Sequence, residues 1–190
     1  MKLTFAVALA FVVALQPLTA FADWEIEPSH TNIGFHVSHL GLTKTPGVFR
    51  KFEGKIALND DKIEASSVSF TIDAASIDTT STERDTALRG KDWLDAKRNP
   101  HITFVSKSVR RIDDKHFIVS GDLTIRGKTL PVDFSATLTN RTINPFLQVP
   151  AIGFVANAQV KRTAFGMSKF LPAVGDDVEL EIQTELNQKP

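Results

Sequence analysis

The strongest constraint on the fold is the strict alternation of apolar and polar residues along most of the chain. Val68, Phe70 and Ile72 share one parity, and the polar residues between them share the other. Successive side chains of a β-strand point to opposite faces, so each such run predicts a strand with one apolar and one polar face. Comparable runs lie near residues 24–28, 31–39, 47–58, 66–73, 101–112, 116–126, 128–139, 153–161 and 177–185. We therefore expect about eight or nine strands.

An antiparallel sheet of this size must hide its apolar face and its edges, because both otherwise promote aggregation. Turn-forming segments such as Asn59-Asp60-Asp61 and Arg126-Gly127-Lys128 separate the runs as hairpin connections. No internal repeat or linker divides residues 23–190. These observations predict an all-β fold, a single eight-stranded antiparallel barrel. Alternation does not separate a filled barrel from a hollow one that holds a small ligand, as in lipocalins, nor a barrel from a sandwich.

Alternation stops in residues 84–106. The stretch 84–89 lacks strand periodicity, and Gly90 is well placed to end a helix. Thr82, with Asp85 three residues later, resembles a weak capping box. The segment therefore predicts a short helix, which a plain barrel does not need.

A second helical turn is expected directly after this helix. Asp92 can cap a turn that carries Trp93 and Leu94, and Pro100 then pushes the preceding residue back to extended structure. The helical insertion near residues 83–95 is expected to cover the apolar end of the barrel. Closing the core is its simplest role, and covering a ligand is the alternative.

The first 22 residues resemble an export signal. Lys2 supplies positive charge, Leu3–Leu15 is a nearly unbroken apolar run, and Ala20-Phe21-Ala22 has the small-x-small pattern of a signal-peptidase site. The apolar run is shorter than the roughly 20 residues that span a bilayer. We therefore expect cleavage at about Ala22, a mature domain of residues 23–190, no integral membrane span, and a periplasmic or secreted location. An uncleaved anchor is the alternative.

Composition narrows the classes of function. The chain has no cysteine, which excludes disulfides, thiol nucleophiles and thiolate metal sites. Its formal net charge is zero, so it lacks the basic stripe expected for nucleic-acid binding and the polybasic patch expected for anionic membranes. The 14 phenylalanines and the absence of tyrosine are less ordinary. Phenylalanine supplies apolar area without a polar group, which suits a packed core as well as a ligand-binding lining.

Neither a metal site nor a catalytic site stands out. In an extended strand His30 and His36 would share one face and His39 the other, and no H-E-x-x-H motif occurs. No nucleophile elbow, phosphate loop or dinucleotide fingerprint occurs either. Arg84 and Asp85 could form part of an acid–base pair, but such a pair at a helix start more often holds the cap. We expect no enzyme, no catalytic residue, no metal and no cofactor.

Residues of the helical insertion and of the strands around it carry a resemblance to a known family. The central signature of the YceI-like family is similar to Arg84-Asp85, Leu88, Asp92-Trp93, Asn99-Pro100-His101-Ile102-Thr103-Phe104 and Ser106. Further landmarks follow in the family's order: Trp24, Pro28-Ser29-His30, Phe35-His36-Val37-Ser38-His39, Gly47-Val48-Phe49, Phe52-Glu53-Gly54, Ser76-Ile77-Asp78-Thr79, Gly121-Asp122-Leu123-Thr124-Ile125-Arg126-Gly127 and Arg162-Thr163-Ala164-Phe165-Gly166-Met167. The resemblance covers essentially all of residues 23–190.

The resemblance implies a periplasmic or secreted, lipocalin-like barrel whose apolar tunnel holds a polyisoprenoid or a similar long amphiphile. The expected function is that of a binding or carrier protein for a polyisoprenoid, an isoprenoid quinone or a comparable lipid. A small periplasmic enzyme acting on a lipid or isoprenoid precursor, and a ligand-free stress-response protein, are the alternatives. Ala87 and Asn99 depart from the family's usual histidine and tyrosine, and Thr142–Gly153 resembles a variable loop.

The expected site has an apolar tunnel and a polar mouth. The tunnel residues are Phe35, Val37, Phe49, Phe52, Phe70, Ile72, Leu88, Trp93, Leu94, Phe104, Leu123, Phe134, Phe165 and Met167; the mouth residues are Arg84, Asp85 and Arg162. Ten buried ligand carbons would contribute about 8 kcal/mol before ordering costs, at about 0.8 kcal/mol each. A long-chain lipid is the expected partner, nucleic acid is not, and the sequence leaves a homodimer open.

Overall fold

The computed structural model describes residues 22–189. The strands are β1 (Ala22–Ile26), β2 (Asn32–His39), β3 (Thr43–Phe49), β4 (Phe52–Leu58), β5 (Ser67–Asp73), β6 (Ile77–Asp78), β7 (His101–Arg111), β8 (His116–Ile125), β9 (Lys128–Ile143), β10 (Pro150–Lys161) and β11 (Val174–Gln188). The helical elements in these residues are α1 (Thr82–Arg89) and the 3-10 turns η1 (Pro28–His30), η2 (Ile63–Ala65), η3 (Ala74–Ser76) and η4 (Arg162–Phe165). The expected export signal lies outside the described residues, so its cleavage stays a prediction.

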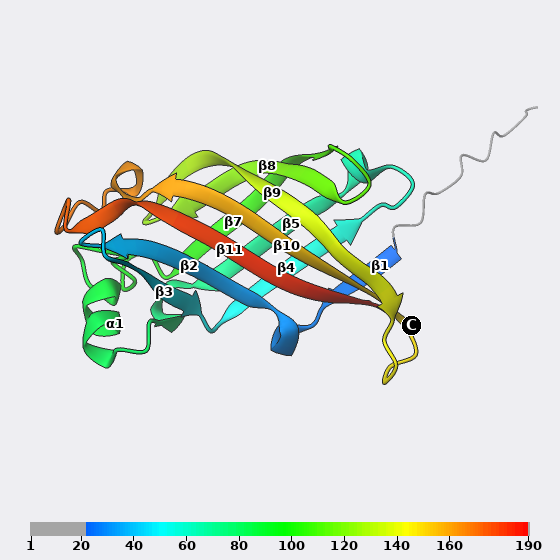
Figure 1. Cartoon of the computed structure of the whole chain (residues 1–190), viewed down its shortest axis with the longest axis horizontal. Helices are drawn as coiled ribbons and strands as arrows, with labels where there is room; N and C mark the ends of the chain where they lie inside the picture. Colours follow the sequence, from blue (N-terminus) through cyan, green and yellow to red (C-terminus); the bar gives the residue numbers. More distant parts are fainter. Residues whose placement is uncertain (1–21, 190) are drawn as a thin grey trace, which may run out of the picture.

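The strands form one antiparallel sheet in the order β1-β4-β5-β7-β8-β9-β10-β11-β2-β3-β6, and β1 also pairs with β11, which closes a barrel (Figure 1). The consecutive segments β1 and β2, β3 and β4, and β5 and β6 follow one another as three bent strands. On one side of the bends β1 pairs with β4 and β4 with β5, and on the other side β2 pairs with β3 and β3 with β6. Counted as bent strands, the eleven segments make the eight expected strands. The all-β, lipocalin-like barrel is confirmed, although alternation had not separated β3 from β4 nor indicated β6.

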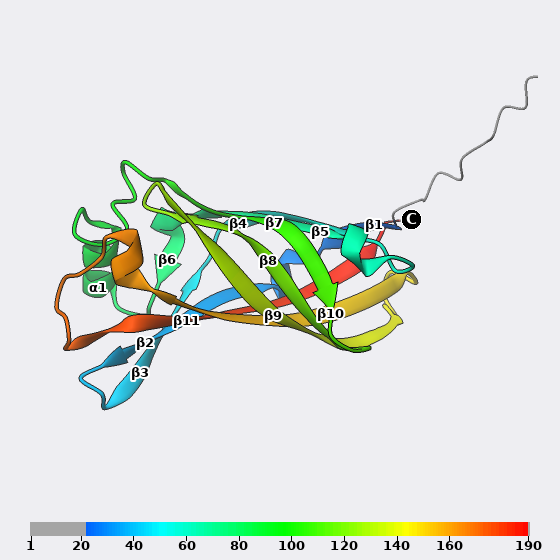
Figure 2. The ribbon, with the colours of Figure 1, turned by 90° about the horizontal axis from the view of Figure 1, so that it is seen from above.

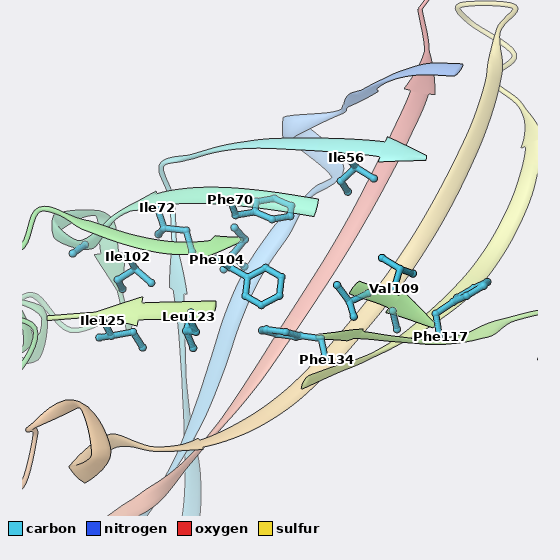
Figure 3. Packing of buried hydrophobic residues seen from close by; sticks show 14 of the residues in the cluster. Ile56, Phe70, Ile72, Ile102, Phe104, Val109, Phe117, Leu123, Ile125 and Phe134 are labelled. Atoms are coloured by element: carbon cyan, nitrogen blue, oxygen red, sulfur yellow. The ribbon is translucent and has the colours of Figure 1, made fainter. Parts of the chain in front are cut away.

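The predicted alternation becomes the inside and the outside of this barrel. In β8, Phe117, Val119, Gly121, Leu123 and Ile125 are buried, and the residues that alternate with them are half-buried. Inward-facing residues of the other strands meet them, and Figure 3 shows this packing around Phe104 and its neighbours. The core is therefore the set of residues of one parity, drawn from strands all around the ring.

The two ends of the barrel differ in their connections (Figures 1 and 2). One end carries α1, the β2–β3 turn (40–42) and the β10–β11 connection (162–173). We call it the helix end, and we call the opposite end, with the β9–β10 connection (144–149), the far end. Within residues 22–189, no helix is both long and apolar enough to cross a membrane.

The helix α1 lies where the sequence predicts it, but residues 91–94 and 96–98 form turns and not the expected second helical turn, and the caps differ in two respects. The N-cap of α1 is Ser81, whose hydroxyl accepts a hydrogen bond from the Arg84 N–H (3.4 Å), so the expected cap at Thr82 is wrong. Gly90 ends the helix, as expected. Asp92 does not cap the next turn, because its carboxylate accepts a hydrogen bond from Lys169 Nζ (2.7 Å). This contact ties the insertion to the β10–β11 connection.

Candidate functional site

The barrel is partly empty at the helix end. A cavity of about 410 Å³ lies inside the sheet and beneath the helical insertion. A second void of about 90 Å³ lies closer to the far end, and both are bordered by Phe70, Phe104, Phe134 and Ile182. The alternative that the sequence left open is therefore resolved in favour of a hollow barrel with one large and one small chamber.

Aromatic rings lie at the junction of the two chambers. The ring centroids of Phe104 and Phe134 lie 5.0 Å apart, and the two planes meet edge to face at 74°. Figure 3 shows both side chains directed into the interior, with Phe70 beside them. Edge-to-face pairs are a favoured arrangement of aromatic rings. A packed pair of rings thus separates the two chambers.

Glycines explain why large rings leave the larger chamber open. Phe35 pairs with Gly47 across β2 and β3, and a Cβ on Gly47 would lie closer than 3.0 Å to the Phe35 ring. Phe70 pairs with Gly54, where a Cβ would lie 2.6 Å from the Phe70 ring. Each ring therefore lies against the backbone of the neighbouring strand and does not extend across the lumen. The pairing register thereby keeps space free inside the barrel.

The helical insertion and η4 close this chamber. Leu88, Trp93 and Leu94 line it from the insertion, Phe165 lines it from η4, and Met167 lines it from two residues after η4. Phe165 is 1% exposed, so η4 is firmly packed into the core. The cover therefore consists of two connections from opposite sides of the mouth.

Arg162 joins these two covers. The residue is 2% exposed, and its guanidinium donates to three carbonyl oxygens, those of Gly175 (Nε, 2.7 Å), Met167 (Nη1, 2.8 Å) and Val174 (Nη2, 2.8 Å). It also lies 5.1 Å from the centroid of the Trp93 ring, a cation–π contact with the insertion. Burial lowers the pKa of Arg162, and the charge of Asp176 opposes that shift. Arg162 therefore holds the η4 region together and supplies positive charge at the cavity wall.

Arg84 and Asp85 converge on Thr79. Arg84 lines the mouth of the cavity, and its Nε donates to Thr79 Oγ1 (2.7 Å). The buried Asp85 carboxylate accepts from the Thr79 N–H (2.9 Å) and from its hydroxyl (2.6 Å), and it does not line the cavity. Among the described residues, neither Arg84 nor Arg162 has a carboxylate oxygen within 4.0 Å. Asp85 thus anchors the helix start, while both arginines present unpaired charge to the cavity.

All expected tunnel residues line this cavity except Phe52, which is half-buried on β4 with its ring centroid 6.3 Å from that of Phe70. Contact with a ligand stays a prediction for each of them. The cavity has further lining residues that were not predicted from the sequence: Ile33, Gly34, His39, Thr45, Ile77, Thr79, Ala87, Ile102, Ile125, Val160, Phe170, Val174, Val178, Leu180 and Ile182. The parity that selected Phe35 and Phe104 also selects Ile33, Ile102 and Ile182. Phe170 lies in an irregular connection, where parity carries no information.

The histidines are separated by the fold. His30 belongs to η1, so its expected place on one strand face with His36 is wrong, because the 3-10 turn interrupts the strand. His39 lines the cavity mouth. In the part of the chain that the structure describes, no three His, Asp or Glu side chains lie close enough together to hold a metal ion.

Comparisons with known proteins agree with the fold. A family model for the YceI-like domain matches residues 24–186. A protein named YceI from Escherichia coli is 34% identical over 166 residues, which cover 86% of this chain and 86% of that relative. The crystal structure of BcnA from Burkholderia cenocepacia has a TM-score of 0.77 at 27% identity, covering 85% of this chain and 99% of that one.

A more distant solved structure has the same fold. It is described as a polyisoprenoid binding domain from Saccharophagus degradans implicated in plant cell wall breakdown. Its TM-score is 0.69 at 12% identity, covering 88% of this chain and 99% of that one. At this identity the likeness shows the shared architecture alone.

Proposed function

Because the chain belongs to the family of YceI-like domains, we propose that it is a periplasmic binding or carrier protein for a long-chain amphiphile. The apolar tail, that of a polyisoprenoid, an isoprenoid quinone or a similar lipid, occupies the 410 Å³ cavity. The polar head lies at the helix end. The protein performs no chemistry on this ligand.

The cavity is the observation that carries the proposal. Its volume falls within the roughly 300–1,000 Å³ of typical ligand pockets, and almost all its walls are apolar side chains. Water needs two to four polar partners to occupy such a space favourably, and the walls offer few. An apolar tail gains free energy from the same walls, at about 0.8 kcal/mol per buried CH₂. The polyisoprenoid named for the Saccharophagus degradans domain of the same fold supports this ligand class.

The two arginines support the orientation of the ligand. Arg84 and Arg162 line the cavity near the insertion, and neither forms an ion pair among residues 22–189. A polar or anionic head group placed there would meet both charges, and the tail would then extend toward Phe104 and Phe134. Asp85 takes no part, since its carboxylate faces Thr79. The catalytic alternative therefore lacks a carboxylate at the cavity.

Native mass spectrometry of protein purified from its own periplasm, with extraction and identification of the bound lipid, tests the proposal. We expect an amphiphile to be recovered repeatedly, and the mass of the intact species also reports any homodimer. Protein that is folded, never carries a lipid, and takes up no added isoprenoid would contradict the proposal.

A matched pair of variants links the ligand to the cavity. Val160 lines the chamber from β10, whereas Val155 has the opposite parity on the same strand. Val160→Phe should fill space in the cavity and reduce lipid recovery severalfold, with the melting temperature maintained. Val155→Phe adds the same ring outside the chamber and should leave recovery unchanged. Equal recovery from both variants would place the lipid elsewhere.

A further inference from the structure

Apolar side chains are exposed around the mouth of the cavity. Leu40 and Leu42 of the β2–β3 turn are 56% and 79% exposed, and Phe170 and Leu171 of the β10–β11 connection are 61% and 42% exposed. Both connections lie at the helix end (Figures 1 and 2). We call these four residues the apolar rim. Single exposed apolar residues are ordinary, but four around one opening form an apolar patch of the kind that marks an interaction site.

The two halves of the apolar rim are held together by backbone hydrogen bonding and strand pairing. The Leu40 N–H donates to the Ala173 carbonyl (2.6 Å), and Val174 pairs with His39 at the edge of the sheet. The two connections therefore keep a common position relative to the cavity. Leu40 and Leu42 are held beside Phe170 and Leu171 without needing a partner to assemble them.

Two residues of the apolar rim have a backbone conformation that is unusual for large apolar side chains. Leu40 has φ 54° and Phe170 has φ 62°, in the left-handed region that bulky residues rarely adopt. Glycine or asparagine would occupy this region with less strain. A large apolar side chain that is both strained and exposed contributes little to the fold, which makes it a candidate for function.

The rim is continuous with the wall of the cavity. The Phe170 ring lines the cavity, and its centroid lies 6.3 Å from that of Trp93 in the insertion. Val174, the first residue of β11, also lines the cavity. An amphiphile that passes between a membrane and the chamber would therefore remain on apolar surface throughout.

The two lysines beside the apolar rim are each paired with a carboxylate. Lys169 Nζ lies 2.7 Å from the Asp92 carboxylate, and Lys44 Nζ lies 2.6 Å from that of Glu179. Anionic bilayers are recognised by clusters of unpaired lysine or arginine, which these lysines do not form. The rim therefore offers apolar contact and not electrostatic attraction.

We propose that the apolar rim inserts into the surface of a phospholipid bilayer, so that the cavity opens toward the lipid that supplies or receives the amphiphile. This inference rests on the proposed function. A second copy of the chain fits less well as the occupant. Even a fully buried aromatic side chain contributes at most about 250 Å², and these four residues are only partly exposed. They cannot by themselves supply the roughly 800 Å² per partner of a standard protein interface.

Flotation with phosphatidylcholine vesicles tests the proposal on the full mature protein. The test variant is Leu40→Asn combined with Leu42→Ser, because neither residue lines the cavity and asparagine tolerates the left-handed backbone. We expect this variant to lose at least tenfold in vesicle binding while it keeps its melting temperature and its bound lipid. Phe146→Ser is the matched control, because Phe146 is 92% exposed at the far end. It should bind vesicles as the wild type does.

The salt dependence of vesicle binding and the oligomeric state of the variants complete the test. Apolar insertion predicts that binding persists from about 0.1 M to about 1 M salt, where the Debye length falls from about 10 Å to about 3 Å. Binding that requires anionic lipid, that survives in the double variant, or that is lost in Phe146→Ser overturns the proposal. So does a change in the monomer–dimer balance of the double variant without a change in vesicle binding. Lipid recovery without vesicle binding would refute the rim alone, and vesicle binding without lipid recovery would refute the proposed function.

Discussion

The two ends of the barrel are built from the same alternating strands, yet one is filled and the other is hollow. At the far end, Phe117 and Val109 are buried and leave a void of only about 90 Å³. At the helix end, inward-facing residues of the same type surround about 410 Å³. Hydrophobicity therefore does not distinguish the two ends, since both present apolar parity to the interior.

The two ends differ in the orientation of their phenylalanine rings and in the segments that close them. Toward the helix end, Phe35 lies against Gly47 of the next strand, which keeps its ring out of the lumen. That end is closed by the insertion and η4, which Arg162 links by hydrogen bonds and by its contact with Trp93. The far end carries the structural core, and the helix end holds space for a ligand under a separate cover.

Truncating one phenylalanine in each chamber should have the largest effect and should separate the two roles. Phe117→Ala at the far end is expected to lower the free energy of unfolding by about 3–5 kcal/mol, the usual cost in a packed core. Phe104→Ala should cost less, because its ring already borders empty space on both sides. Removing that ring also joins the two chambers.

Urea unfolding measures how much each variant is destabilised, and mass spectrometry of the recovered lipid measures the length of the bound chain. We expect longer chains to be retained by Phe104→Ala and unchanged chains by Phe117→Ala. Equal destabilisation with unchanged lipid in both variants would mean that the two chambers do not differ in function.

Arg162→Met tests the link between the two covers of the helix end. Three buried or partly buried carbonyls would lose their partner, and each unsatisfied group costs about 1–3 kcal/mol. We expect a loss of about 3 kcal/mol, which lowers the melting temperature by roughly 6–12 °C for a domain of this size. The neighbouring Lys161→Met removes only exposed ion pairs and should change it little. Similar melting temperatures for the two variants would refute the structural role of Arg162.

Asp85→Ala tests whether the buried carboxylate anchors the insertion or performs chemistry. Thr79 loses two acceptor contacts, so we expect a destabilisation of about 1–3 kcal/mol by thermal or urea unfolding. Lipid recovery from the protein that remains folded should survive. Turnover of a lipid by the wild type that disappears in this variant, with ligand retention intact, would instead support the enzyme alternative.

Acidification should weaken the η4 region at the helix end by a smaller amount. Hydrogen bonds from the Thr163 N–H and hydroxyl, together with the charges of Lys161 and Arg162, lower the pKa of Asp176. A carboxylate with a lowered pKa in the folded state stabilises the fold above its unfolded pKa of about 3.9. That contribution is lost as the pH falls through the folded pKa.

Melting temperatures measured below about pH 4 should therefore fall less steeply in Asp176→Asn than in the wild type. The neighbouring Asp177→Asn is the matched control, because Asp177 contacts Lys161 and not Thr163. If the melting temperature of Asp176→Asn fell with pH as steeply as that of the wild type, Asp176 would not be the source of the acid sensitivity.

The sequence was sufficient for the fold and for about half of the cavity lining, because both depend on parity. A residue such as Phe104 or Leu123 faces the interior whenever its strand has the expected register, and residue type then makes it apolar. The short helix ending at Gly90 was also predictable, since caps and periodicity are local signals. Local signals did not distinguish Ser81 from Thr82 as the N-cap, since both side chains carry a hydroxyl that can accept a hydrogen bond from the first turn of the helix.

Only the tertiary structure decided which part of the barrel is empty. Void volume depends on which side chains of distant strands meet across the lumen, as Phe104 meets Phe134 and as Phe35 meets Gly47. Parity likewise placed Phe52 in the tunnel, whereas the bend between β3 and β4 leaves it beside Phe70 and off the cavity. The three carbonyl partners of Arg162 come from the β10–β11 connection and from the start of β11, where periodicity does not indicate which carbonyls lack a partner. Alternation determines a face, and the packing of faces around the ring determines the space between them.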